Sequence, residues 1–164
     1  MPESYKEYDL KKAILKNMKK FLLEFGREFI FIDEEYHVQV GNNDYYVDLL
    51  FYHRELQCLV VINLKIDDFK PEYMGKMDFY LEALDRDIKK PHENPSVGMI
   101  FCENVDTDVV EYSLSRSLSQ TMIAEYKSIR FTLDDGTENE RTILSDVHAF
   151  YEPEELVGKT YLQL

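Results

Sequence analysis

Three polar residues on two neighbouring predicted strands could together bind a metal ion or a phosphate group. Asp48 interrupts one apolar run, and Asn63 and Lys65 end the next one. A four-residue loop between these runs places Asp48 opposite Asn63, and Tyr46 opposite Lys65, in an antiparallel hairpin. Because side chains alternate between the faces of a strand, we expect Asp48, Asn63 and Lys65 on one face. Polar groups on such strands need partners or a ligand, although an Asp–Lys pair at a solvent-facing end of the sheet would also explain them.

The hydrophobic pattern predicts the elements that position these residues. Apolar residues at three- and four-residue steps predict a helix from Tyr5 to about Phe25, which Gly26 is placed to end. A second helix is expected from Pro71 to about Lys90, with the proline in its first turn. A third helix is expected at 109–118, and β-branched and aromatic residues predict strands at 29–33, 37–40, 45–53, 58–65, 96–102 and 122–126.

The order of these elements predicts an α/β domain with a mixed sheet flanked by helices. Residues 29–65 are expected to form an antiparallel meander, whereas a helix between the later strands indicates parallel pairing there. We expect residues 1–126 to form the core and residues 127–164 to be an extension packed on the same domain. That extension is expected to contain a hairpin around Asp135 and Gly136.

Composition limits the class of protein. A chain of 164 residues with 45% hydrophobic residues fits one folded domain. It has neither a long apolar run nor a signal-like start, so we expect a cytoplasmic protein in which Cys58 and Cys102 are buried free thiols. The net charge of −13 argues against a simple nucleic-acid coat, because phosphate binding depends on Lys and Arg. Residues 1–30 are the more basic end, although their lysines would also suit the solvated face of an amphipathic helix.

The motifs, taken together, resemble one bacterial family. The stretches FLLEFGREFIFI, YYVDLLFYHRELQCLVVINLK, FKPEYMGKMDFYLEALD and NPSVGMIFC are similar, from about Phe21 to Tyr126, to the YhcG-like family, or domain of unknown function 1016. The C-terminal half of that family is a predicted PD-(D/E)xK nuclease. The resemblance implies a restriction-endonuclease-like αβββαβ core and a DNA endonuclease dependent on Mg²⁺ or Mn²⁺. Analogy with such enzymes suggests a homodimer, and the N-terminal helical domain of the family, thought to engage DNA or partners, is expected to be absent here.

The resemblance also implies roles for particular residues. Asp48 matches the central metal-binding Asp, and Lys65 matches the Lys of the (D/E)xK motif. Glu24 matches a glutamate of the first helix, and the helical stripe it continues would point its carboxylate toward the sheet, although an exposed last-turn glutamate is an open alternative. The metal would then be bound by Asp48, Asn63, Glu24 and the backbone carbonyl of Leu64.

The departure from the family pattern leaves two functions open. The family has Glu-Leu-Lys where this chain has Asn63, Leu64 and Lys65, so one carboxylate is replaced by a neutral amide that attracts a hard cation less. One hypothesis is a Mg²⁺-dependent endonuclease attenuated by Asn63. The alternative is a catalytically inactive nuclease fold that binds DNA or a protein partner. Lys76 and Tyr80 lie one helical turn apart on the second helix, where related enzymes often have a Gln or Lys in a supporting role. The resemblance therefore implies a supporting role for these two residues.

Overall fold

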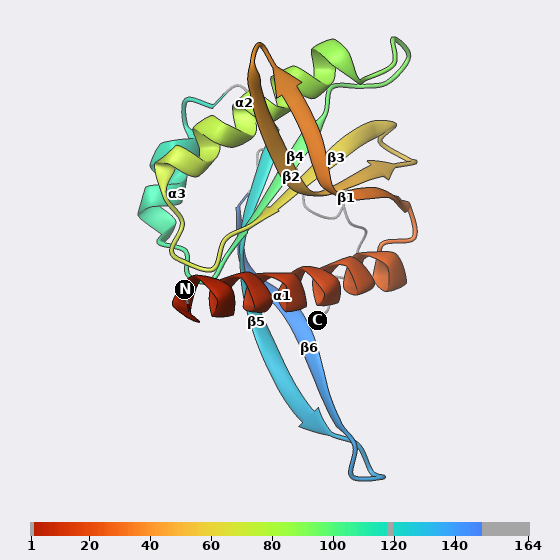
Figure 1. Cartoon of the computed structure of the whole chain (residues 1–164), viewed down its shortest axis with the longest axis vertical. Helices are drawn as coiled ribbons and strands as arrows, with labels where there is room; N and C mark the ends of the chain where they lie inside the picture. The colour runs from red at the N-terminus through yellow and green to blue at the C-terminus, as the bar shows by residue number, and fades with distance from the viewer. Residues whose placement is uncertain (1, 118–119, 149–164) are drawn as a thin grey trace.

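The computed structural model describes residues 2–117 and 120–148, in which six strands form one mixed sheet in the order β1-β2-β3-β4-β5-β6. Helices cover both faces of this sheet (Figure 1). The predicted αβββαβ order is confirmed, and the segments 29–33 and 37–40 form a single strand. The elements are α1 (Pro2–Phe25), β1 (Phe29–Val40), β2 (Asn43–His53), β3 (Cys58–Leu64), α2 (Pro71–Asp87), β4 (Val97–Cys102), α3 (Thr107–Leu114), β5 (Thr121–Thr132) and β6 (Glu138–His148).

The sheet combines two kinds of pairing. Strands β1, β2 and β3 pair antiparallel, β3, β4 and β5 pair parallel, and β6 returns antiparallel to β5. Parallel neighbours need crossover connections, which α2 and α3 supply. Two right-handed crossovers that advance in the same direction lie on the same face, so α2 and α3 lie together and α1 is left to cover the other face.

Two apolar layers follow from this arrangement. Strand β3 is buried along its whole length because it lies between helices on both faces. Each buried Leu, Ile or Met side chain contributes about 1.5–3 kcal/mol to folding. The layer under α1 includes Ile14, Met18, Phe21, Leu22, Phe51, Ile62 and Leu64. The layer under α2 and α3 includes Leu50, Val61, Met77, Leu81, Leu84, Ile100 and Val110.

Strand β1 is irregular where it passes the middle of β2. The pairing register shifts between Phe31 and Asp33, and Glu35 has a positive φ of 48°. The register shift falls within the expected segment 29–33, and Glu35 lies between that segment and 37–40. On β2, Asp48 falls between Val47 and Leu49, which pair with β1 on either side of Glu35. The irregular part of β1 therefore lies beside Asp48 on β2.

Helix α1 ends before Gly26 as predicted, whereas α2 and α3 end earlier than expected, α3 at Leu114 and not at 118. Gly26 does end α1, but it has no left-handed φ; instead a Cβ at this position would lie 2.5 Å from Phe29 Cδ2 and 2.8 Å from the Leu22 carbonyl oxygen. Close approach is thus the reason for glycine here. Helix α2 begins at Pro71 as predicted. It ends at Asp87, with Ile88 as the C-cap residue, and so does not extend to Lys90.

The C-terminal hairpin is confirmed. Strands β5 and β6 meet at a turn in which Gly136 has a φ of 87°, and the hairpin extends away from the helices (Figure 1). The predicted boundary at residue 127 falls inside β5, and the division into core and extension stays a prediction, since residues 149–164 lie outside the described part of the chain. Cys58 and Cys102 are buried free thiols, as expected. Within the described residues, no helix is both long and apolar enough to cross a membrane.

Candidate functional site

The predicted hairpin register is confirmed up to the point where β2 and β3 separate. The ladder runs from His53↔Cys58 to Leu49↔Ile62. Beyond it, the Leu64 N–H donates to Asp48 Oδ2 at 2.7 Å, so a side-chain carboxylate takes the place of a strand partner. The Asp48 N–H makes only a long contact of 3.4 Å with Asn63 Oδ1. Asp48 and Asn63 are therefore adjacent, at the opening between the two strands.

Tyr46 does not meet Lys65, and that expected pair is wrong. The β2–β3 ladder stops before Tyr46, which instead pairs with His37 on β1. Its ring stacks on the His37 imidazole with centroids 5.1 Å apart, and His37 Nε2 lies 2.6 Å from Asp44 Oδ1. Tyr46 therefore belongs to the exposed tip of the β1–β2 hairpin.

Helix α1 brings a lysine to Asp48. The Lys11 ammonium lies 3.0 Å from Asp48 Oδ1, with the side chains 33% and 16% exposed. Both carboxylate oxygens of Asp48 are thus engaged, one by Lys11 and the other by the Leu64 N–H. The sequence contains no signal for this contact, since the helical pattern predicts which side of α1 is apolar but not where α1 crosses the sheet.

Lys65 lies close to Asp48 but reaches toward the other layer. Its ammonium lies 4.8 Å from the centre of the Tyr73 ring on α2. Burial lowers the pKa of Lys65, and the like charge of Lys11 lowers it further, while Asp48 acts in the opposite direction. Asp48 contacts Lys11 on α1 and Lys65 lies against Tyr73 on α2, yet the charges of Asp48 and Lys65 still interact. The expectation that Asp48, Asn63 and Lys65 share one face stays a prediction.

Lys76 and Tyr80 lie beside this centre, on α2. Burial raises the pKa of Tyr80, and the negative charge of Asp48 raises it further. Lys76 is exposed and is close enough to Lys65 that its charge also lowers the pKa of Lys65. Lys65 thus lies within electrostatic reach of two other ammonium groups, those of Lys11 and Lys76, and of the Asp48 carboxylate.

Glu24 is not part of this centre, which corrects the prediction for it. It lies thirteen residues beyond Lys11 on α1, or about 20 Å along a straight helix at 1.5 Å per residue. Its side chain is 53% exposed and its carboxylate lies 4.0 Å from the Lys20 ammonium. The exposed last-turn glutamate is therefore the correct interpretation. Periodicity placed Glu24 toward the sheet but could not fix its position along the sheet.

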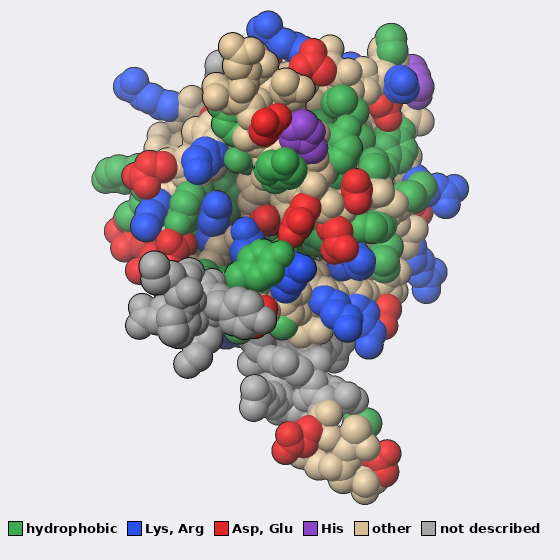
Figure 2. All heavy atoms as spheres, viewed as in Figure 1, with side chains coloured by type: hydrophobic (Ala, Val, Ile, Leu, Met, Phe, Trp, Pro, Cys, Tyr) green, Lys and Arg blue, Asp and Glu red, His purple; other side chains and the backbone are tan. Residues whose placement is uncertain are grey.

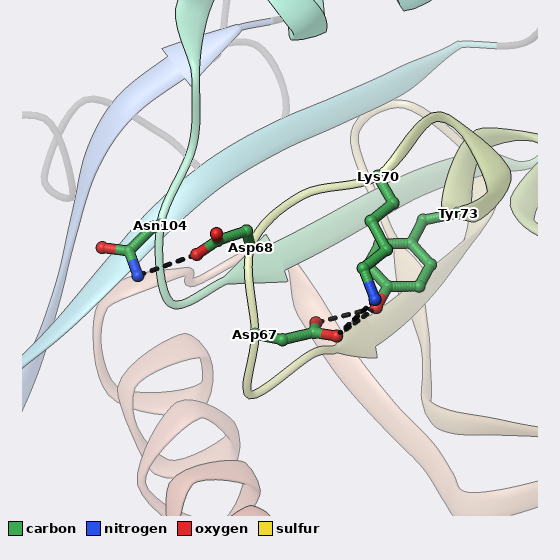
Figure 3. A network of polar contacts seen from close by, with 5 residues as sticks. All are labelled: Asp67, Asp68, Lys70, Tyr73 and Asn104. Carbon is green, nitrogen blue, oxygen red and sulfur yellow. Dashed lines mark hydrogen bonds and ion pairs between the residues drawn. The ribbon is translucent and has the colours of Figure 1, made fainter.

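A second carboxylate near Lys65 was missed. The Tyr73 hydroxyl lies 2.7 and 2.6 Å from the two oxygens of Asp67, and the Lys70 ammonium lies 3.3 Å from Oδ2, as Figure 3 shows. Partial burial opposes ionisation of Asp67, but the hydrogen bonds from Tyr73 and Lys70 outweigh it and keep the pKa of Asp67 below its usual range. The adjacent Asp68 accepts a hydrogen bond from the Asn104 amide at 3.0 Å. Asp67 lies beyond the end of β3, so the alternation of strand residues gives no signal for its position.

The oxygen donors at the opening do not make a complete site for a divalent metal. Mg²⁺ prefers several oxygen ligands with carboxylates among them, whereas this opening offers the Asp48 carboxylate, the neutral Asn63 amide and the Leu64 carbonyl. Among the described residues, no group of three or more His, Cys, Asp or Glu is placed to bind a metal. The Lys11 ammonium, moreover, already lies against Asp48.

The sheet topology and the helices on both faces are those of a nuclease-fold domain. Residues 1–140 match the model of the YhcG PDDEXK nuclease domain, and the chain belongs to this family. The resemblance found in the sequence is thus confirmed, and the match begins well before Phe21. The chain is 31% identical over 127 residues to "Putative nuclease YhcG" of Escherichia coli (strain K12). This alignment covers 77% of this chain and 34% of that protein. The chain therefore spans about a third of the length of that relative.

Two solved structures are also similar. A repair endonuclease from Pyrococcus abyssi has 18% sequence identity and a TM-score of 0.43, and EndoMS in a complex with double-stranded DNA has 15% and 0.44. Each comparison covers 65% of this chain and 41% of the other. At this level of similarity, the fold assignment depends on the family match and on the sheet topology.

Proposed function

We propose that this domain binds the phosphate backbone of DNA at the opening between β2 and β3, and that it hydrolyses phosphodiester bonds only weakly because Asn63 replaces a carboxylate. The observation that carries the proposal is the contact of Lys11 with Asp48, together with the closeness of Lys65 to Lys11, Asp48 and Lys76. Ammonium groups outnumber carboxylates at this point, and a bound phosphate would balance their charge.

The net negative charge of the chain would restrict DNA contact to the opening between β2 and β3. Because the chain carries a net charge of −13, most of its surface repels DNA. Figure 2 shows acidic and basic side chains interspersed over one face, without a broad basic area. Affinity would therefore come from a few phosphate contacts at the opening, and it would fall quickly as salt is added.

Weak hydrolysis follows from the donor set. Asp48 and Lys65 keep the positions that the family motif gives to a metal-binding carboxylate and to the lysine that positions water. Asn63 removes one of the negative charges that would hold a divalent cation beside them. We therefore expect slow cleavage that depends on Asp48.

A catalytically inactive binding module is the second candidate, and the ion pair between Lys11 and Asp48 favours it. In that case the same surface would bind DNA, or a protein partner that carries phosphate-like or carboxylate groups. The two functions differ in one observable, since only the first gives DNA nicking that the Asp48→Ala substitution abolishes. A homodimer stays a prediction under either function.

Fluorescence anisotropy with labelled duplex, single-stranded and branched DNA tests the binding. We expect the logarithm of the association constant to fall against the logarithm of salt concentration with a slope of roughly −2 to −3, as about three phosphate contacts require. Lys65→Ala should weaken binding, whereas Lys20→Ala, on an exposed part of α1, should not. Absence of binding to every DNA at low salt would overturn the proposed function.

A further inference from the structure

We propose that Lys11 is a built-in cation which occupies, at Asp48, the position that a divalent metal would take, so that Lys11 and metal ions exclude one another. This rests on the proposed function only in treating the opening between β2 and β3 as the functional centre. Metal titrations without DNA test it separately.

The contact geometry supports competition for one oxygen. Asp48 Oδ2 accepts the Leu64 N–H at 2.7 Å, so Oδ1 is the oxygen that faces a cation, and Lys11 Nζ lies 3.0 Å from it. Asn63 beside it carries no charge. A divalent ion entering here would therefore meet a positive charge at ion-pair distance.

The packing of α1 holds Lys11 in place. Three residues further along the helix, Ile14 is 7% exposed, and Leu15, four residues further, packs against the same apolar layer. Residues three and four apart lie on one side of a helix, so Lys11 is on the packed side of α1. Lys12, its neighbour in sequence, is exposed. The ammonium is thus fixed by the fold and does not reach Asp48 from a free surface position.

The Lys11 contact and the neutral Asn63 side chain fit together electrostatically. With a glutamate at position 63, a second carboxylate would stand beside Asp48 and add to its attraction for a divalent ion. With Asn63, Asp48 lacks that second carboxylate, and the Lys11 ammonium lies against it. We expect the site to stay folded without a metal ion and to offer its ammonium groups to a phosphate.

The test measures Mn²⁺ affinity by calorimetry in an Asn63→Glu background, where binding is strong enough to follow. Adding Lys11→Gln should raise Mn²⁺ affinity by about tenfold or more, because a unit charge at ion-pair distance is removed. Lys11→Arg, which keeps the charge, should leave affinity within about twofold of Asn63→Glu alone. Lys20→Gln is the matched control, since it removes a lysine from the same helix beside Glu24 and far from Asp48.

The outcomes are separable. Equal Mn²⁺ affinities for the Lys11→Gln and Lys20→Gln double variants would overturn the inference, and so would an equal gain from Lys11→Arg, since the effect would then be positional rather than electrostatic. Thermal unfolding checks that each variant is folded, and Lys11→Met provides a second neutral side chain if Lys11→Gln is not. Failure of DNA binding by the wild-type chain would overturn the proposed function and leave this result unchanged.

Discussion

Polar side chains have different kinds of partner at the two ends of the β2–β3 hairpin. At the closed end, His53 is 2% exposed, its Nδ1 accepts the Leu56 N–H at 3.1 Å, and its ring contacts Phe29 edge to face with centroids 5.0 Å apart. At the open end, Asp48 holds Asn63 through a long 3.4 Å contact and draws its ion-pair partner from another element.

The difference is between a polar group that stabilises its own turn and polar groups that we propose to be functional. His53 finds its hydrogen-bonding partner within three residues, in the turn that it stabilises. The open end instead brings like charges together, and burial and Lys11 both lower the pKa of Lys65. Arrangements that cost stability in this way are typical of functional sites.

The largest expected effect on stability is at the closed end. His53→Ala should lower the free energy of unfolding by about 2–3 kcal/mol, because it leaves the partly buried Leu56 N–H without its acceptor and opens a cavity beside Phe29. Urea unfolding measures it, and Glu55→Ala in the exposed part of the same loop is the control. A change below about 0.5 kcal/mol would show that His53 is not structural.

At the open end we expect the opposite sign. Lys65→Met should raise the free energy of unfolding by about 0.5–1 kcal/mol at neutral pH while weakening DNA binding, since an apolar side chain suits the partly buried position. The folded-state pKa of Lys65 lies below its ordinary value of 10.5, so the folded state binds fewer protons than the unfolded state in the interval between them. Wild-type stability relative to Lys65→Met should therefore rise with pH through that interval. If the difference in the free energy of unfolding between the wild type and Lys65→Met did not change with pH up to about 10.5, the argument that burial lowers the pKa of Lys65 would be contradicted.

A smaller effect is expected for Lys76, which is exposed beside the same centre. Lys76→Ala should weaken DNA binding by about three- to tenfold and reduce the salt slope by about one, with little change in the free energy of unfolding. Anisotropy titrations at several salt concentrations give both quantities. An unchanged slope would remove Lys76 from the phosphate-binding set.

The smallest effect is expected at the far end of α1. Glu24→Gln should change metal affinity and DNA binding by less than about twofold and stability by less than about 0.5 kcal/mol, because Glu24 is an exposed surface residue. Calorimetry with Mn²⁺ in the Asn63→Glu background is the sensitive measurement. A large loss of Mn²⁺ affinity would return Glu24 to the site.

The sequence predicted local geometry well and long-range placement poorly. The four-residue loop set the pairing of β2 with β3, and Pro71 marked the first turn of α2, because both depend on neighbouring residues. The contact between Lys11 and Asp48 depends on where α1 crosses the sheet, which no periodicity encodes. For the same reason Glu24 was placed at the centre wrongly.

Asp67 and Asn63 show the remaining limit. Asp67 follows the end of β3, in a loop whose course depends on its hydrogen bonds with Tyr73 and Lys70, so its place near Lys65 became visible only in the folded chain. Asn63, by contrast, was identified from the sequence because it stands in a motif of fixed spacing.

The most direct test of the central claim is the rate at which the Asn63→Glu variant nicks supercoiled plasmid DNA in Mg²⁺ or Mn²⁺, compared with the wild-type chain. If the missing carboxylate limits hydrolysis, the variant should cleave at least about tenfold faster, and Asp48→Ala in that background should abolish the gain. A folded Asn63→Glu variant that binds DNA as tightly as the wild-type chain and nicks it no faster would contradict the account.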